Sequence, residues 1–425
     1  MLDPKLIREE PDRVRKGLAA RAARVDLDGL IALDRRFREK TQALEALRYR
    51  KRTASDAVGR GKRSGEEVSG KLADLKKLSE EEKALAAEAA ALEQEVRARC
   101  LEIPNLPHDS IPVGPPKANR VERTWGTPRK FDFKPLDHMA LTDKLGLVDF
   151  ARAAKISGAH FLLFTGLGAR LERGLINFML DLHTQQHGYR EIWPPYLVNR
   201  AAMTGTGQLP KMEADMYRLA EDDLFLIPTA EVPVTNIYAG EILEAGALPV
   251  RMAAFTGCFR REAGSYGRET RGMTRVHQFD KVEMVQLVEP ERSYEVLEEL
   301  VGHAERVLQL LEIPYRVVCL ASQDISFSAA KCYDIEAWSP ATDGWLEVSS
   351  CSNFEDFQAR RAQIRFRDKQ KKVRLVHTLN GSGVALARTV IALLENHQNA
   401  DGTVQLPKAL RPYLGGLDRL TPDTA

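Results

Sequence analysis

Apolar residues recur at alternating spacings of three and four over residues 27–101, in two stretches separated by glycines. In the first stretch the heptad a and d positions hold Leu30, Leu33, Phe37, Leu44, Leu47, Ala54 and Val58, interrupted by Lys40 and Lys51. In the second they hold Val68, Leu75, Leu78, Leu85, Ala89, Leu92 and Val96, interrupted by Lys71 and Glu82. Sustained spacing of this kind is typical of a coiled coil. It predicts an antiparallel helical hairpin whose turn lies in the glycine-rich residues 59–65.

The pattern changes beyond residue 101. Five prolines between residues 104 and 116 cannot continue a helix. They predict a boundary between an N-terminal domain, residues 1–110, and a second domain, residues 111–425. In the second domain, strand-like alternation is interspersed with helical runs, which predicts an α+β fold. Residues 170–187 form one amphipathic helical run, and the double proline after residues 191–193 indicates an edge strand or an interface.

Charge adds a second feature to the predicted hairpin. The net charge of the chain is +2, but residues 1–100 hold 24 basic and 19 acidic side chains, whereas the remainder holds 38 and 41. Eleven basic and three acidic residues lie between Arg35 and Arg63. Two interpretations are open: a solvated coiled-coil surface, or a surface that binds a polyanion such as a nucleic acid.

The sequence argues against several classes of protein. No run approaches 18 apolar residues, and the N-terminus resembles neither a signal peptide nor a transit peptide. The five cysteines form no Cys-x-x-Cys pattern, which disfavours a disulfide scaffold and a thiolate zinc site. We therefore expect a soluble cytoplasmic protein without a membrane partner.

The first segment with candidate chemistry is a predicted β-hairpin with a Gly- and Arg-rich loop. Its first strand ends in residues 256–264, the loop continues to Gly272, and the second strand covers residues 275–283. Phe279, Lys281 and Glu283 share one face of the second strand, and Phe279 and Glu283 are roughly 13 Å apart. An aromatic ring for a base and a carboxylate for an ammonium at that separation fit an aminoacyl adenylate. The alternative is an exposed hairpin with structural Arg–Glu pairs.

Three further segments carry unusual residues. Residues 380–395 are predicted as a glycine-rich helix start and an apolar helix, with Arg388 as the only charge in twelve residues. Its guanidinium needs a phosphate or, alternatively, a structural partner such as Glu231 or Glu347. The strand-like residues 345–353 offer an acid and hydroxyls for Mg²⁺. Thr229 is expected to share a strand face with Glu231.

These segments resemble the seryl-tRNA synthetases of bacterial type, within the class II aminoacyl-tRNA synthetases. The helix and strand before Pro194 and Pro195 resemble motif 1, residues 259–283 resemble motif 2, and residues 381–388 resemble motif 3. Residues 206–211, 229–231, 276–279 and 349–356 resemble stretches specific to the seryl branch. The resemblance covers essentially the whole chain. It implies an antiparallel class II sheet flanked by helices, with the coiled-coil hairpin as an N-terminal tRNA-binding arm.

The resemblance also implies roles for individual residues. The serine pocket would consist of Thr229, Ala230, Glu231, Glu283 and Ser382, with Glu283 binding the substrate ammonium. The ATP site would consist of Arg260, Arg261, Glu262, Arg275, Phe279, Glu347, Val348, Ser349, Ser350 and Arg388. Arg260, Glu347 and Arg388 would act in catalysis, and Glu347 with Ser350 would hold Mg²⁺. The arm would bind tRNA through Arg50, Lys51, Arg52, Arg60, Lys62 and Arg63.

The implied reaction is ATP-dependent ligation of L-serine to tRNA(Ser) through seryl-adenylate. The implied partners are L-serine, ATP, a tRNA(Ser) with a long variable arm, tRNA(Sec) as a further substrate, and a second copy in a homodimer, but no DNA. Two other functions stay open at this point. One is a synthetase-like paralogue that loads an amino acid onto a carrier protein, and the other is a non-catalytic coiled-coil RNA-binding protein.

Overall fold

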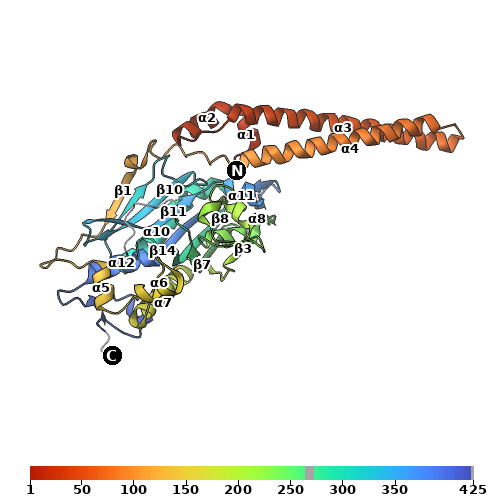
Figure 1. Ribbon diagram of the computed structural model, residues 1–425. Helices are drawn as coiled ribbons and strands as arrows, with labels where there is room; N and C mark the ends of the chain where they lie inside the picture. Colours follow the sequence, from red (N-terminus) through yellow and green to blue (C-terminus); the bar gives the residue numbers. More distant parts are fainter. Residues whose placement is uncertain (264–271, 423–425) are drawn as a thin grey trace. The chain divides into compact units, whose positions relative to one another are not determined.

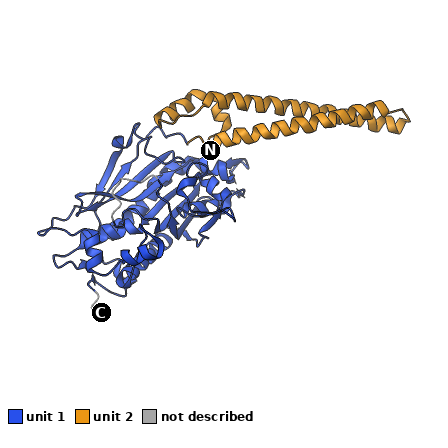
Figure 2. Ribbon diagram, viewed as in Figure 1, with its two compact units in different colours: residues 1, 105–425 blue, residues 2–104 orange. Residues whose placement is uncertain are grey.

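The computed structural model describes residues 1–263 and 272–422. The chain forms two compact units, one of Leu2–Pro104 and one of Met1 with Asn105–Ala425 (Figure 2). Most of the predicted motif 2 loop falls on residues 264–271, outside the described residues. Within the described part of the chain, no helix is long and apolar enough to cross a membrane.

The first unit consists of helices. Its elements are α1 (Pro4–Glu9), α2 (Pro11–Ala20), α3 (Leu27–Ser64) and α4 (Ser69–Leu101) (Figure 1). Helices α3 and α4 form the predicted hairpin, and the buried side chains between them include Leu30, Leu33, Leu44, Leu47, Val58, Ala89 and Val96. The two lysines that interrupt the heptads of α3 form ion pairs with α4: Lys40 pairs with Glu88 at 2.6 Å, and Lys51 pairs with Glu82 at 2.7 Å.

The predicted position of the turn is wrong. Helix α3 continues through Gly59 and Gly61 and ends at Ser64, so the turn begins at Gly65. Gly65 has a φ of 75°, the left-handed conformation that ends many helices. A side chain at Gly61 would meet Val68 at 2.8 Å, so this glycine allows the chain before the turn and the chain after it to approach closely. One or two glycines weaken a helix by about 1 kcal/mol each, which is too little to break a packed one.

The second unit is built on an eight-stranded sheet with the order β1-β9-β10-β11-β14-β8-β7-β2. These strands are β1 (Arg120–Trp125), β9 (Tyr315–Cys319), β10 (Lys331–Ser339), β11 (Gly344–Asn353), β14 (His377–Ala385), β8 (Gln278–Val288), β7 (Val250–Phe259) and β2 (Arg190–Glu191). Neighbouring strands are antiparallel except β2 and β7. The short β2 lies at one edge, as the double proline after it predicts.

Helices and smaller sheets complete this unit. The helices are α5 (His138–Lys144), α6 (Phe150–Ser157), α7 (Gly166–Asp181), α8 (Arg200–Thr206), α9 (Glu231–Thr235), α10 (Ser293–Leu310), α11 (Phe357–Ala362) and α12 (Leu386–His397). The smaller sheets are β3 (Leu197–Asn199) with β5 (Leu224–Leu226) and β4 (Arg218–Leu219), β13 (Val373–Leu375) with β12 (Arg365–Arg367) and β6 (Ile242–Leu243), and β15 (Val404–Gln405) with β16 (Arg419–Leu420). The α+β prediction is confirmed.

One face of the large sheet meets α7, α10 and α12 in the main hydrophobic core. Val282 and Met284 of β8 belong to this core. Because side chains alternate along a strand, Lys281 and Glu283 point to the opposite face. The core therefore fixes the sheet from one side and leaves the polar side chains of the central strands on the other.

A cluster of histidines lies in the core next to α10. His183 is in a π-helical segment, Leu182–Gln186, and its Nδ1 is 2.9 Å from Nδ1 of His187. The ring of His187 stacks on His303 at 4.1 Å. Burial, with a smaller contribution from the neighbouring histidines, lowers the pKa of His183 to about 3. The folded protein thus holds His183 in its neutral form.

This cluster predicts a loss of stability in acid. The pKa of His183 in the folded protein lies below its unfolded value of about 6.5. The stability that depends on neutral His183 is therefore complete above about pH 6.5, and it is lost as the pH falls toward the folded pKa. Between about pH 7 and pH 4.5 the free energy of unfolding should fall by about 2–3 kcal/mol more in the wild type than in His183→Gln. Urea unfolding at both values measures this difference. A parallel fall in both proteins would contradict it, and His160→Gln, at an exposed histidine, should behave like the wild type.

Candidate active site

The predicted serine-pocket residues come from three neighbouring parts of the second unit. Glu283 of β8 is paired in register with Ser382 of β14. Thr229 and Ala230 lie in the turn after β5, and Glu231 begins α9. The expected strand face shared by Thr229 and Glu231 is therefore wrong. The hydroxyl of Thr229 accepts a hydrogen bond from the Glu231 amide at 3.2 Å, a local contact that favours a turn over a strand.

The glycine-rich residues 380–383 are also placed differently from the prediction. They lie within β14, and the following helix begins only at Leu386. A side chain at Gly381 would meet the Cys351 sulfur at 2.7 Å, and one at Gly383 would meet His183 at 2.5 Å. These glycines therefore allow close packing around a central strand and do not start a helix.

Two carboxylates are buried in the pocket. Glu283 is 2% exposed and accepts a hydrogen bond from the Ser382 hydroxyl at 3.4 Å. Glu231 is 9% exposed and accepts from Gln358 of α11 at 2.5 Å. Burial, and then the nearby charge of Glu283, raises the pKa of Glu231 to about 7. Two acids this close and this buried favour a positively charged ligand.

The pocket contains a cation to which the sequence analysis assigned no role. Lys281 is 6% exposed, forms an ion pair with Glu283, and donates a hydrogen bond to the Thr229 hydroxyl at 2.8 Å. Strand alternation does place it on the face of Glu283, but only the fold brings Thr229 to it. Because the Lys281 ammonium and the Glu231 amide both donate to Thr229, the Thr229 hydroxyl can itself only donate to a ligand.

Gln358 is a second residue that the sequence analysis missed. Its amide nitrogen contacts Glu231, and its oxygen accepts a hydrogen bond from Thr378 at 2.7 Å. The same nitrogen donates to the carbonyl of Thr206 at 3.1 Å. Gln358 thereby ties Thr206, in the seryl-like stretch of residues 206–211, to the pocket carboxylate.

The predicted ATP residues of motif 2 lie at the open ends of β7 and β8. The guanidinium of Arg260 lies 5.2 Å from the centre of the Phe279 ring, and its Nε donates to the carbonyl of Pro228 at 3.3 Å. Glu262 pairs with Arg275 at 2.8 Å, so one of the structural Arg–Glu pairs of the alternative interpretation is present. The guanidinium of Arg261 lies 5.7 Å from the centre of the Tyr217 ring.

The predicted metal ligands lie on β11, where a β-bulge changes the alternation. Glu347 pairs in register with Glu336, but Ser349 pairs with Ile335, so Val348 is the extra residue. The bulge puts Glu347 and Ser350 on one face, whereas strict alternation would separate them. Ser349 donates to the carbonyl of Ser382 at 2.7 Å and so links β11 to β14.

The charge of Arg388 has a structural partner. Its guanidinium is 3.3 Å from the Glu347 carboxylate and donates to the Glu347 carbonyl at 2.9 Å. The Arg388–Glu347 pair of the alternative interpretation is therefore present. About half of the Glu347 side chain is exposed, so the pair lies at the mouth of the site, open to a phosphate group.

Glu347 and Ser350 suit a magnesium ion of the kind that accompanies ATP. Asp334 and Glu336 of β10 pair in register next to Ser350 and Glu347, so this face is rich in oxygen ligands. Among the described residues, no three acidic, His or Cys side chains converge on a metal position. Mg²⁺ commonly takes one or two protein ligands and completes its shell with water and phosphate oxygens, and the residues present fit that mode.

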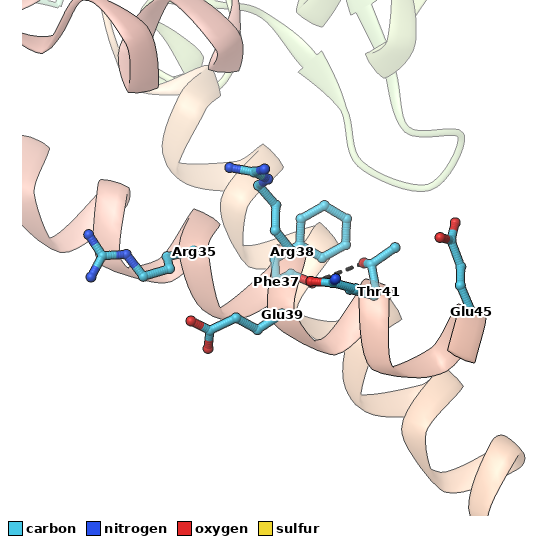
Figure 3. A pocket seen from close by; sticks show the side chains of 7 residues that line it. Arg35, Phe37, Arg38, Glu39, Thr41 and Glu45 are labelled. Atoms are coloured by element: carbon cyan, nitrogen blue, oxygen red, sulfur yellow. Dashed lines mark hydrogen bonds between the residues drawn. The ribbon is translucent and has the colours of Figure 1, made fainter. Parts of the chain in front are cut away.

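Five of the six predicted tRNA-binding residues are exposed on α3: Arg50, Arg52, Arg60, Lys62 and Arg63. Lys51 is half-buried and is held by Glu82. A hollow of about 510 Å³ also lies along α3, lined by Arg35, Phe37, Arg38, Glu39, Thr41, Gln42 and Glu45 (Figure 3). Its charges balance and it contains none of the predicted site residues, so we do not assign it a ligand.

Comparisons with known proteins identify the family of the chain. A model of the class II tRNA synthetase core domain (G, H, P, S and T) matches residues 213–397, and one of the seryl-tRNA synthetase N-terminal domain matches residues 1–107. The chain is 52% identical to a serine–tRNA ligase of Carboxydothermus hydrogenoformans over 99% of both chains.

Solved structures give the same result. The seryl-tRNA synthetase of Pyrococcus horikoshii in complex with ATP superposes with a TM-score of 0.91 at 38% identity, covering 99% of this chain and 100% of that one. The cytoplasmic serine–tRNA ligase of Naegleria fowleri in complex with AMP gives 0.88 at 28% identity, covering 100% and 99%. The predicted class II fold is thus confirmed, and the chain belongs to the seryl-tRNA synthetase family of class II aminoacyl-tRNA synthetases.

Proposed function

We propose that this protein ligates L-serine to tRNA(Ser) in two ATP-dependent steps. In the first, the serine carboxylate attacks the α-phosphorus of ATP, and pyrophosphate leaves. In the second, the 3′-hydroxyl of the terminal tRNA ribose attacks the carbonyl of the seryl-adenylate, and AMP leaves. The observation that carries the proposal is the buried pair of carboxylates, Glu231 and Glu283, beside two arginines at the mouth of one site.

The pocket suits a small amino acid with a hydroxyl group. Glu283 binds the substrate ammonium, and Thr229, Ala230, Glu231 and Ser382 surround the rest of the molecule. Thr229 offers one donor, and Glu231 and Glu283 offer acceptors, so a ligand hydroxyl finds partners of both kinds. An analogue that lacks the hydroxyl leaves buried polar groups unpaired, which is a strong basis for rejecting alanine.

The ATP site neutralises and orients the triphosphate. Arg260 contacts the α-phosphate, Arg388 with Arg275 contacts the outer phosphates, and Phe279 stacks on adenine, whose amino group Glu262 binds. Arg261, Val348 and Ser349 complete the binding site. When bound, Mg²⁺ supplies additional positive charge at the phosphates, and Glu347 with Ser350 would hold it. In-line displacement then needs positioning and charge neutralisation more than a general base.

The two parts of the chain have separate tasks in this proposal. Residues 111–425 carry out the chemistry, and residues 1–110 bind the long variable arm of tRNA(Ser) through the basic side chains of α3. The same arm would accept tRNA(Sec). The protein works in the cytoplasm as a homodimer, in which β2 and the segment around Pro194 and Pro195 form the contact between copies.

Serine-dependent ATP–pyrophosphate exchange without tRNA tests the chemistry. We expect exchange with serine, and rates at least about a hundredfold lower with alanine and threonine. Charging of tRNA(Ser) is measured next with the same preparation. Exchange without charging would point to a carrier-protein ligase, and no exchange with serine, threonine, alanine or cysteine would overturn the catalytic proposal.

The contacts of Lys281 give a further expected result. Lys281→Met removes the ammonium that balances Glu283 and orients Thr229, so kcat/KM for serine should fall at least about tenfold. The KM for ATP should stay within about twofold of the wild-type value, because the side-chain contacts of Lys281 are with the serine-pocket residues Glu283 and Thr229. Lys281→Arg keeps the charge and should retain more activity. Steady-state exchange kinetics against both substrates measure this, and equal changes in the two KM values would contradict it.

A further inference from the structure

A short basic hairpin in the second unit has no role in the site described above. Strands β12 and β13 with their turn, residues 365–375, hold six basic side chains and a single acidic one. The surrounding residues 101–425 carry 38 basic and 41 acidic side chains, so the hairpin is a local basic region in an otherwise slightly acidic part of the chain.

The turn is rigid, and its acid is used to build it. Asp368 accepts hydrogen bonds from the backbone amides of Gln370 and Lys372, both at 2.9 Å. The Lys371 amide donates to the Asp368 carbonyl at 2.8 Å, and Lys371 has a φ of 65°. A lysine in this left-handed conformation costs about 1–2 kcal/mol, which glycine would avoid. The turn therefore keeps a lysine at its tip in spite of backbone strain.

The strand arginines and the turn lysines differ in their contacts. Arg374 pairs with Glu291 and lies over Phe366, and Arg367 is 3.9 Å from Glu244. By contrast, Lys369, Lys371 and Lys372 are exposed and form no ion pair with any described residue. Three free ammonium groups on a rigid turn are thus available to an external polyanion.

The base of the hairpin is connected to the pocket. Phe366 of β12 belongs to the same hydrophobic cluster as Ala230, which lies between the pocket residues Thr229 and Glu231. Helix α11, which supplies Gln358 to Glu231, ends three residues before β12. The basic turn therefore belongs to the same compact unit as the pocket that receives the 3′ end of the RNA in the proposed function.

We propose that Lys369, Lys371 and Lys372 form a second RNA-binding surface, which contacts phosphates of the tRNA acceptor stem. The inference rests on the proposed function for the identity of the RNA. It differs from the arm in its target, since an acceptor stem lacks the variable arm that α3 is proposed to bind. Contacts of this kind add affinity without base specificity and weaken with salt.

The experiment compares full-length proteins in direct RNA binding, which does not depend on catalysis. The variant is Lys369→Gln/Lys371→Gln/Lys372→Gln, and the control is Lys117→Gln/Lys130→Gln/Lys408→Gln, which removes the same charge from exposed positions elsewhere. The RNAs are tRNA(Ser) and an acceptor-stem minihelix without a variable arm. Affinity is measured by fluorescence anisotropy over about 50–300 mM KCl.

For the hairpin variant, we expect at least about tenfold weaker minihelix binding at low salt and a slope of log K against log[KCl] reduced by about 2–3. The control should stay within about twofold of the wild type, and serine-dependent exchange should be unchanged in both. A hairpin variant with a slope within about 0.5 of the wild type, or a control that weakens equally, would overturn the inference. RNA binding that follows the expected pattern in a protein without serine exchange would instead overturn the proposed function alone.

Discussion

Replacement of Arg260 by alanine should lower serine-dependent ATP–pyrophosphate exchange about a thousandfold, which corresponds to about 4 kcal/mol of transition-state stabilisation. Arg260 lies over Phe279 and is held by the Pro228 carbonyl, and none of the described carboxylates forms an ion pair with it. Its charge is therefore available to the α-phosphate, where negative charge increases during the displacement. Since the interaction strengthens in the transition state, kcat should fall more than the KM for ATP rises.

Arg251→Ala is the matched control for this result. Arg251 lies near the start of β7, whereas Arg260 directly follows the other end of this strand, and Arg251 pairs with Glu299 at 2.7 Å. We expect its exchange rate to stay within about threefold of the wild type. If Arg260→Ala retains exchange within tenfold, or if Arg251→Ala loses as much, the assignment of Arg260 to the phosphate is wrong.

Neutralisation of the exposed arm residues should have an equally large effect on a different step. With Arg50, Arg52, Arg60, Lys62 and Arg63 all changed to glutamine, kcat/KM for tRNA(Ser) should fall a hundredfold or more at roughly physiological salt. The salt dependence of tRNA binding should also become weaker by about one unit of slope for each lost phosphate contact. Exchange without tRNA should not change, because these side chains belong to a separate compact unit.

Lys51 provides the internal control for the arm. Its ammonium is already neutralised by Glu82, so Lys51→Gln alone should change tRNA charging by less than about threefold. Charging assays of both variants beside exchange assays separate binding from chemistry. Full tRNA charging by the five-residue variant would show that the basic surface of α3 is a solvated coiled-coil face.

The arm shows how far a periodic pattern can be trusted. The contact between two packed helices repeats every three or four residues. The apolar spacing alone is therefore enough to identify the buried positions of α3 and α4. The position of the turn is a different matter. Gly59 and Gly61 look like a break in composition, but tertiary packing across the hairpin holds them in the helix, and the chain reverses only after Gly65 adopts a positive φ.

Motif residues could be named from the sequence, but their contacts could not. The bulge at Val348 decides that Glu347 and Ser350 share a face, and a bulge depends on the register with the neighbouring strand β10. The same holds for Gly381 and Gly383, whose place in β14 follows from the close approach of Cys351 and His183. These contacts join residues far apart in the chain, so no local pattern predicts them.

By itself, the sequence determined the helical arm, its basic surface, the α+β class and the family resemblance, because each depends on local periodicity, composition or short motifs. Only the tertiary structure decided that Lys281 contacts both Glu283 and Thr229, that Gln358 donates to Glu231, and that Glu347 pairs with Arg388. A buried charge must find its partner within a few ångströms, and which residues come that close is decided by strand register and core packing.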